Sequence, residues 1–227
     1  MNLEPKRYKT PFTKAWWSNA WYYYKWHIVG VVAAILAIGL FLVECATTVK
    51  PDFTITYMGG IDAMGQIEAY ELEDKFATIT KDIDNDEKNT AKFNVIYLDK
   101  ETSNEAGVAM FDMANVEMAG GNAVVLLFDK EFVDRYSKYG FCDLGEYAKE
   151  FSIDESLLKR YDDGSVYAIN MGQNPIFTQF ENVDADDLYL CVRPLRGNEK
   201  AKWQKANHEN GLAMARYIIS GGNVNPY

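Results

Sequence analysis

The sequence predicts an α/β protein: a single N-terminal transmembrane helix followed by one extracytoplasmic domain with a mixed, partly parallel sheet flanked by helices. Three observations lead to this class. Residues 28–43 carry no charge and are almost entirely apolar. After Lys50 the chain alternates β-type and helical stretches, as layered α/β domains do. Residues 123–128 are apolar on both faces, as expected of a central strand covered on both sides.

The apolar run is close to the length that a membrane needs. Sixteen residues span roughly 24 Å of helix, a little less than the ~30 Å hydrocarbon core, so flanking residues complete a span predicted at 28–45. Aromatic residues crowd its N-terminal side and are expected at the membrane interface: Trp16, Trp17, Trp21, Tyr24 and Trp26. A cleaved signal peptide is the alternative, but the long aromatic lead and the lack of a small-x-small cleavage site favour an uncleaved anchor.

The charges around the span predict its orientation. Five of the 23 Lys and Arg residues precede it, and just after it the only nearby cation is Lys50. Because positive residues stay on the cytoplasmic side, we expect a single-pass protein of the cell membrane. Residues 1–27 are then cytoplasmic, 46–51 form a tether, and 52–227 form the extracytoplasmic domain.

The composition of the outer domain limits its partners. Two of the 33 acidic residues lie before the tether, so 18 cations face 31 acids in the rest of the chain. A domain this acidic is not expected to bind nucleic acid through a general field. The expected partners are the lipid bilayer and a membrane or envelope protein.

The elements of the domain follow from hydrophobic period and turn residues. Five segments have strand patterns: 53–58, 93–98, 123–128, 166–170 and 188–192. Five have helical patterns: 63–80, 103–118, 130–139, 144–151 and 198–220. Asp163-Gly164 supplies a turn before the fourth strand, and Gly221-Gly222 supplies a left-handed stop after the last helix. Asn198 is the expected cap of that helix.

Part of the domain resembles the first lobe of extracellular solute-binding proteins of the sugar-transporter type. The run NAVVLLFDKEFVDRYSKYGFCDLGEYAKEF, which starts at Asn122, resembles that family's buried strand, its helix, and the Gly and Asp-Leu before the next helix. The run DDGSVYAINMGQNP, which ends at Pro175, resembles its Asp-Gly-x-x-Tyr strand leading toward the hinge. The likeness implies a lobe-like fold. Only about 50 residues follow the hinge strand, too few for a second lobe, so a two-lobed ligand trap is not expected.

The whole chain has a second resemblance. With its Trp- and Tyr-rich lead, one span and a small outer domain, it resembles uncharacterised single-pass membrane-anchored proteins of anaerobic Gram-positive bacteria. This likeness implies the same anchored arrangement and brings no activity with it.

Three acidic residues have the spacing that opens a calcium loop: Asp82, Asp84 and Asp86. The sixth position of such a loop is Gly and here is Glu87, while the twelfth is a bidentate Glu and here is Phe93. Because the turn residue and the strongest ligand are missing, the aspartates are interpreted as a remnant, and a solvated connection is favoured. No metal and no other cofactor is predicted.

The cysteines offer one candidate disulfide, between Cys142 and Cys191 in the outer domain. It would close a loop of about 50 residues and add on the order of 3–4 kcal/mol. Two unbridged thiols are the alternative. No CxxC is present, so a redox or zinc motif has no support.

A ligand site, if the fold has one, is expected beyond the carboxyl ends of the strands. The residues at those predicted ends are Gly59, Gly60, Asp99, Asp129 and Gln173. Ordinary strand-end turns account for the same residues, so the ligand-binding assignment stays a hypothesis.

No motif fixes a chemistry. The chain has two histidines, no GxSxG elbow, no Walker loop and no GxGxxG after a strand. An enzyme is therefore the least favoured class, and no catalytic residue is named. We expect a membrane-anchored extracytoplasmic interaction or ligand-binding module, accessory to a membrane or envelope complex. A structural subunit of a membrane complex, held by its transmembrane segment, is the alternative.

Overall fold

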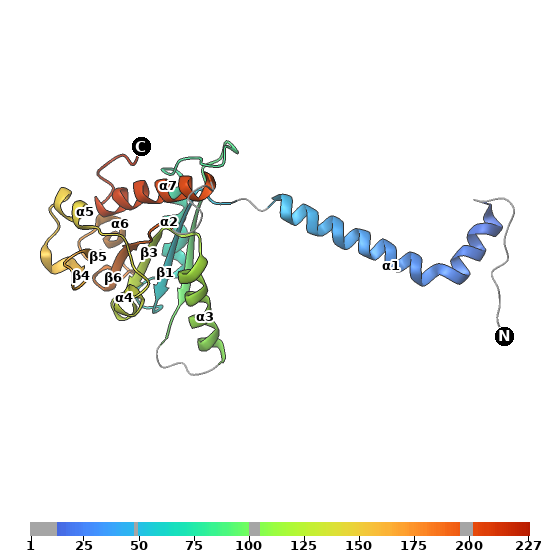
Figure 1. The fold of residues 1–227 in the computed structure, drawn as a ribbon, viewed down its shortest axis with the longest axis horizontal. Coiled ribbons are helices and arrows are strands. Elements are labelled where there is room, and N and C mark those ends of the chain that lie inside the picture. Colours follow the sequence, from blue (N-terminus) through green and yellow to red (C-terminus); the bar gives the residue numbers. More distant parts are fainter. Residues whose placement is uncertain (1–12, 48–49, 100–104, 196–201) are drawn as a thin grey trace. The chain divides into compact units, whose positions relative to one another are not determined.

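The computed structural model describes residues 13–47, 50–99, 105–195 and 202–227. The chain divides into two compact units, Met1–Lys50 and Pro51–Tyr227. The first contains one described helix, and the second contains the sheet and its flanking helices (Figure 1).

The helix of the first unit, α1 (Lys14–Thr47), has 34 residues. Thr13 starts it, because the Thr13 hydroxyl accepts from the backbone N–H of Trp16 at 3.3 Å and the Thr13 carbonyl accepts from that of Trp17 at 3.0 Å. The aromatic lead and the apolar run therefore belong to one helix, although its ribbon bends in its N-terminal part (Figure 1). The Thr10–Pro11 region lies outside the described residues.

The second unit is built on a six-stranded sheet with the order β2-β1-β3-β6-β5-β4. The strands are β1 (Phe53–Gly59), β2 (Ala91–Tyr97), β3 (Val125–Asp129), β4 (Leu158–Arg160), β5 (Val166–Asn170) and β6 (Leu188–Val192). β1 pairs in parallel with β2 and β3, whereas the β3–β6, β6–β5 and β5–β4 pairs are antiparallel. The predicted mixed, partly parallel sheet is confirmed.

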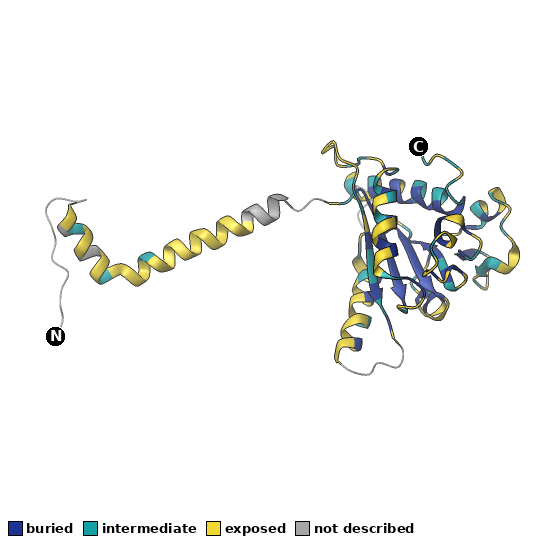
Figure 2. Cartoon of the chain, turned by 180° about the vertical axis from the view of Figure 1, so that it is seen from behind, coloured by how far each residue is buried: buried dark blue, intermediate teal, exposed yellow. Residues whose placement is uncertain are grey.

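Helices cover both faces of the sheet. On one face, α2 (Gln66–Ala77) and α7 (Lys202–Ile219) close a core in which Ile55 packs with Leu72 and Ile218. On the other face, α3 (Glu105–Gly120) and α4 (Lys130–Ser137) close a core in which Phe128 packs with Met118 and Phe132. The strands are dark throughout most of Figure 2, because side chains on both faces are buried. The predicted double-sided burial of the central strand is confirmed, since all five residues of β3 are buried.

The remaining elements are short. They are α5 (Gly145–Glu150), α6 (Pro175–Thr178) and the 3-10 turns Glu155–Leu157 and Ala185–Asp187. The predicted strands at 166–170 and 188–192 match the structure, and the other predicted elements differ at their ends by a few residues. Sequence analysis missed β4 and α6, which have three and four residues.

The last helix ends as the sequence predicts. Gly221 and Gly222 have φ values of 71° and 84°, a left-handed backbone that suits glycine. Their N–H groups return to the carbonyls of Ile218 and Tyr217 at 2.9 and 3.0 Å, which satisfies the open end of α7. Asn198, the expected cap at the other end, lies outside the described residues.

Candidate functional site

Three of the predicted strand-end residues meet at the carboxyl edge of β1 and β3. The Gly60 N–H donates to Asp129 Oδ2 at 2.6 Å, and the Tyr57 hydroxyl donates to the Gly60 carbonyl at 2.6 Å. A Cβ placed on Gly59 would lie 2.7 Å from Asp129 Oδ2, so this position has no room for a side chain. Gly59, Gly60 and Asp129 thus lie close together, as expected for residues at the ends of neighbouring strands. A hydrogen bond joins Gly60 to Asp129, and Gly59 lies against the same carboxylate.

Asp129 also starts α4. Its Oδ1 accepts from the N–H groups of Glu131 and Phe132, both at 3.0 Å, which is the geometry of a helix N-cap. Together with Gly60, these donors occupy both carboxylate oxygens of a buried side chain. Asp129 therefore acts as a structural clamp between β1, β3 and α4.

The same edge carries an acidic field that sequence analysis did not identify. Burial raises the pKa of the Asp129 carboxyl, although its three backbone donors act in the opposite direction. Burial and then the charge of Asp129 raise the pKa of Asp187, which lies just before β6. Burial and the same charge raise the pKa of the Tyr57 hydroxyl. Because β6 pairs with β3, residues far apart in the sequence share one negative environment.

Asp99 and Gln173 do not join this clamp. Both are exposed, Asp99 after β2 and Gln173 after β5. Their strands lie at opposite sides of β1, β3 and β6, so the two ends are roughly 19 Å apart at ~4.8 Å per strand. The five predicted residues thus follow one edge of the sheet without forming one site.

Gln173 lies instead on a cavity of about 600 Å³ between the end of β5, the end of α5 and the segment after α7. Two amides on its wall already have structural roles. The Asn174 side chain donates to the Ile218 carbonyl at 2.6 Å and accepts from Ile176 N–H at 3.0 Å. The Asn170 side chain donates to the carbonyls of Asp186 and Leu188 at 2.7 and 3.2 Å. These amides hold α6 and β6 in place.

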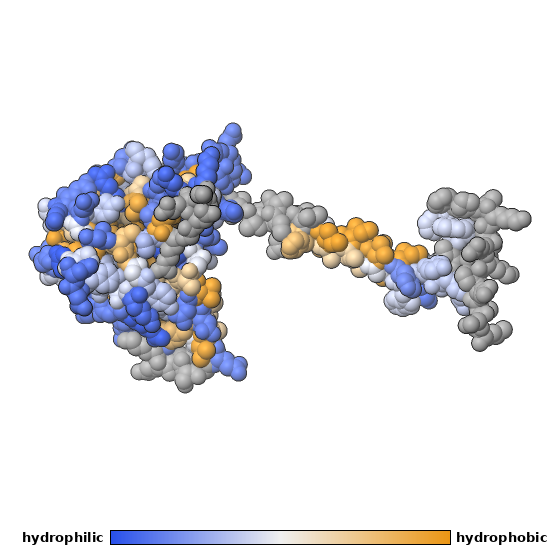
Figure 3. Space-filling view, in the orientation of Figure 1, coloured by the Kyte–Doolittle hydropathy of each residue, from blue (hydrophilic) through white to orange (hydrophobic). Residues whose placement is uncertain are grey.

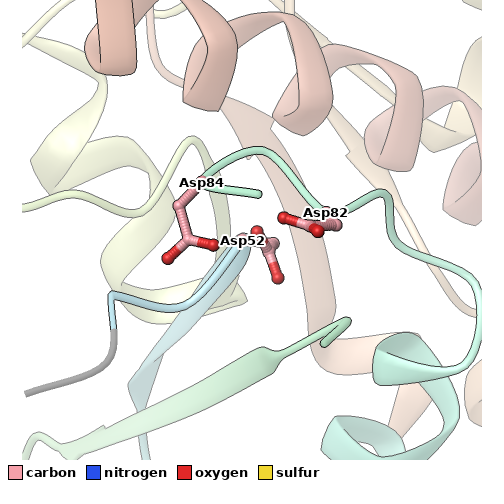
Figure 4. A group of neighbouring side chains, drawn as sticks. All are labelled: Asp52, Asp82 and Asp84. Atoms are coloured by element: carbon pink, nitrogen blue, oxygen red, sulfur yellow. The ribbon is translucent and has the colours of Figure 1, made fainter. Parts of the chain in front are cut away.

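The calcium-loop remnant is rearranged. Carboxylate oxygens of Asp82 and Asp84 converge with one from Asp52, within 4.8 Å of one another, while Asp86 is outside the group (Figure 4). These are the described residues that best fit oxygen ligation of a cation. The third member, Asp52, precedes β1 and was not found by sequence spacing.

Backbone donors already engage all three of these carboxylates, since Asp84 accepts from Asp86 N–H at 3.1 Å. Asp52 is buried and accepts from Ile83 N–H at 2.7 Å and from Thr90 N–H at 2.8 Å. Asp82 accepts from Asn85 N–H at 2.6 Å and from Glu87 N–H at 3.0 Å. The cluster therefore organises the connection between α2 and β2.

The candidate disulfide is absent: both thiols are free. Cys142 N–H donates to the Val192 carbonyl at 2.8 Å, and Cys142 packs against the core that contains Val192. Cys191 belongs to the core on the other face of the sheet. Adjacent residues of a strand point to opposite faces, so the sheet separates the two sulfur atoms. Burial raises the pKa of both thiols.

The five expected interface aromatics all lie on α1. Trp17, Trp21, Tyr24 and Trp26 are exposed, and Trp16 is half-buried. Within α1, the segment Trp21–Phe41 is long and apolar enough to cross a membrane, and none of it is buried. Length and composition of this kind also fit a signal sequence near the N-terminus.

Sequence analysis also missed a set of polar contacts made by Arg193 at the end of α3, which we call the polar lock. Arg193, which is buried, donates to the Glu117 carbonyl at 2.7 Å, forms an ion pair with the Glu117 carboxylate at 3.2 Å, and donates to the Gly121 carbonyl. His208 Nε2 lies 3.0 Å from the Arg193 carbonyl, beside a cavity of about 280 Å³. The lock fixes the C-terminal end of α3 to the end of β6.

The rest of α3 packs against the domain through few buried side chains. Gly107, Ala114 and Met118 are its buried residues, whereas Met113 and Val116 are 51% and 71% exposed. Figure 3 shows apolar surface over this helix. Between α3 and β2 lies a groove of about 610 Å³, lined by Asn94, Val95, Ile96, Ala109, Asp112, Met113, Val116 and Glu117. We call it the α3–β2 groove.

Comparison with known proteins adds no family. No family model, no curated protein and no solved structure matches the chain. The resemblances to solute-binding lobes and to membrane-anchored proteins of anaerobic bacteria therefore remain predictions.

Proposed function

We propose that this protein is a membrane-anchored extracytoplasmic interaction module that serves a membrane or envelope complex. The observation that carries the proposal is the joining, in one chain, of an unburied 21-residue apolar helix segment to a folded domain that leaves an apolar groove open. Exposing the helix segment and the groove to water is unfavourable, because both are apolar. Large apolar surfaces of this kind are usually covered by lipid or by a protein partner.

The anchor follows from the energetics of Trp21–Phe41. Fully burying one Val, Leu or Ile side chain is worth about 1.5–3 kcal/mol, and this segment is rich in such residues. None of this segment is buried in the structure. A bilayer core of ~30 Å accepts a helix of this length with its backbone hydrogen bonds closed.

The orientation rests on the flanking charges. Lys14 lies on α1 before Trp21–Phe41, and Lys25 lies near the start of that segment, before the uncharged run at 28–43. The positive-inside rule therefore favours a cytoplasmic location for that end of the helix. The domain then begins at β1, close behind the end of α1 at Thr47. Five intervening residues reach at most about 20 Å, which keeps the domain near the membrane surface. A short tether suits a module that works on neighbours in the same membrane.

Fractionation and protease protection test this proposal. The full-length chain should stay with membranes in alkaline carbonate, and its intact mass should include residues 1–47. Protease added outside intact cells should digest the 52–227 domain after the wall is opened, while a cytoplasmic control protein survives. A shorter product in the medium would establish a signal sequence, and a protected domain in accessible cells would reverse the topology. Either result overturns the proposal.

A further inference from the structure

The first turns of α1 carry aromatic rings and cations, in contrast to the aliphatic residues of its later part. Four of the five tryptophans of the chain lie here, at positions 16, 17, 21 and 26. Lys14 and Lys25 are exposed on the same stretch. Trp and Tyr side chains favour the headgroup layer of a bilayer over its hydrocarbon core, because each ring has an apolar body and a polar tip. The composition therefore suits the layer in which phosphate groups lie.

The two lysines lie on one side of the helix, which we call the Lys14–Lys25 face. Eleven residues make about three turns, so Lys14 and Lys25 point in nearly the same direction. Ser18 and Trp21 lie between them at spacings of four, three and four residues, which keeps all four on this face. Ser18 is exposed, and Trp21 is 56% exposed. The face thus offers two ammonium groups and an indole N–H as donors to phosphate oxygens.

The bend in α1 brings both lysines within reach of one layer. In a straight helix that crosses the bilayer along its normal, Lys14 would lie about 16 Å beyond Lys25. A headgroup layer is only about 5–8 Å thick, so a straight helix would leave Lys14 outside it. Figure 1 shows instead that the first turns run at an angle to the apolar part of α1. The first turns can therefore follow the membrane surface while the apolar part crosses the hydrocarbon core.

We propose that the Lys14–Lys25 face binds anionic phospholipid headgroups, whose phosphate oxygens accept hydrogen bonds from the two lysines and from the Trp21 indole. Charge complementarity selects this partner. Residues 1–27 hold one acid, Glu4, and five cations: Lys6, Arg7, Lys9, Lys14 and Lys25. Basic residues next to a membrane span attract anionic lipid, whereas a zwitterionic headgroup carries no net charge for them to attract.

The placement of the rings favours lipid over a protein partner. A helix that docks into a protein groove concentrates its anchors on one side, at spacings of three and four residues. Tyr22, Tyr23 and Tyr24 follow one another directly, and each is turned by about 100° from the last, so the three rings alone point to three sides of the helix. Trp17 and Trp26 add rings that are 54% and 77% exposed. Rings on all sides suit a layer that surrounds the helix.

Lipid binding at this face rests on the proposed function, because it requires α1 to lie in a membrane. The two can fail separately. Carbonate extraction shows whether the chain is embedded, whereas lipid preference is measured in reconstituted vesicles and does not depend on orientation, since both leaflets have the same composition. An embedded chain without lipid preference retains the anchor and loses this inference. A chain that carbonate releases, but that binds vesicles only when they contain anionic lipid, does the reverse.

Quenching of tryptophan fluorescence by brominated lipids tests the preference in the full-length chain. Vesicles of phosphatidylcholine and phosphatidylglycerol carry bromine on one lipid or on the other. Phosphatidylglycerol should be enriched about threefold or more beside the tryptophans, and roughly 1 M salt should abolish the enrichment, because the screening length falls to about 3 Å.

Lysine substitutions locate the enrichment. Lys14→Gln with Lys25→Gln should remove at least about half of it, since each lysine near the surface contributes to the attraction. Lys88→Gln with Lys149→Gln is the matched control, because both lysines are exposed on the 52–227 domain and the change in net charge is the same. It should leave the enrichment unchanged. No enrichment in the wild type, or equal losses in both double variants, overturns the proposal.

Photo-crosslinking in native membranes separates lipid from protein. A benzophenone amino acid at position 18 should give an adduct heavier by one phospholipid, with anionic headgroups more frequent than in the membrane as a whole. Position 36 is the control, because Leu36 is 63% exposed in the apolar part of α1, and its adducts should match the bulk lipid. A protein adduct at position 18 in place of lipid assigns the face to a protein partner, and headgroups in bulk proportion there remove the preference. Either result overturns the proposal.

Discussion

Two edges of the same sheet differ in how their polar groups and side chains are satisfied. One is the carboxyl edge of β1 and β3, and the other is the outer side of β2. At the first, Gly60, Tyr57 and Asp129 bond to one another across 69 residues of sequence. At the second, Glu73 covers the N–H of Phe93, and the apolar wall of α3 beside it is open. A closed polar edge uses its donors and acceptors for stability. The apolar edge instead leaves side chains of α3 such as Met113 and Val116 exposed.

The largest expected effect compares the two sides of α3. Met118→Ala should lower the free energy of unfolding by about 3 kcal/mol, because Met118 is 1% exposed and its removal leaves a cavity. Met113→Ala, the same change on the groove side, should alter it by less than about 0.5 kcal/mol. Urea unfolding followed by far-ultraviolet circular dichroism measures both. Equal values would remove the distinction between a packed and an open side.

A smaller effect is expected at the closed edge. Asp129→Ala removes the cap of α4 and leaves the Gly60 N–H without its acceptor, which should cost about 2 kcal/mol. Asp74→Ala is the control, since Asp74 is an exposed carboxylate on α2. The same unfolding experiment compares them. If Asp129→Ala is as mild as Asp74→Ala, the hydrogen bonds of Asp129 do not stabilise the fold.

The smallest effect concerns pH. Burial and the charge of Asp129 raise the pKa of Asp187 in the folded state, so its protonated form is favoured there. Its contribution to stability is present below the ordinary value of 3.8 and is lost as pH rises through the folded pKa. Asp187→Asn should therefore be about 0.5 kcal/mol more stable than wild type near pH 7, with no such advantage near pH 3.

Melting temperatures across this pH range check that difference. Asp163→Asn is a suitable comparison, because hydrogen bonds from Ser165 lower the pKa of Asp163. Its carboxylate stabilises the fold above the ordinary pKa, so its replacement should destabilise at neutral pH. The two substitutions should thus act in opposite directions. Shifts of the same sign would contradict the acidic field assigned to the closed edge.

Local patterns predicted most of the fold. The strands at 166–170 and 188–192 were found because turn residues and apolar runs bound them. β4 was missed because Leu158–Arg160 has one apolar residue and depends on pairing with β5. The order of the strands in the sheet was not predicted either. The apolar pattern of Leu188–Val192 indicates a strand, but it does not show that this strand lies between β3 and β5.

The site was less predictable. Strand-end logic brought Gly59, Gly60 and Asp129 together correctly, but it could not show that they satisfy one another. Asp52 was missed because its partner Asp82 lies 30 residues away. The groove was missed because α3 is apolar around most of its circumference, so its pattern gives no sign of which side meets the sheet. Tertiary pairing decides each of these cases.

The position of β6 has a consequence for how the chain acquires its shape. It is the last strand to be synthesised, yet it joins β3 to β5 in the interior of the sheet. Before residues 188–192 are in place, β3 and β5 each have an unpaired edge, and no strand joins the β1–β3 part of the sheet to the β4–β5 hairpin. Their association depends on contacts between residues far apart in the sequence. We therefore expect β6 to insert between β3 and β5 late in folding, which completes the sheet.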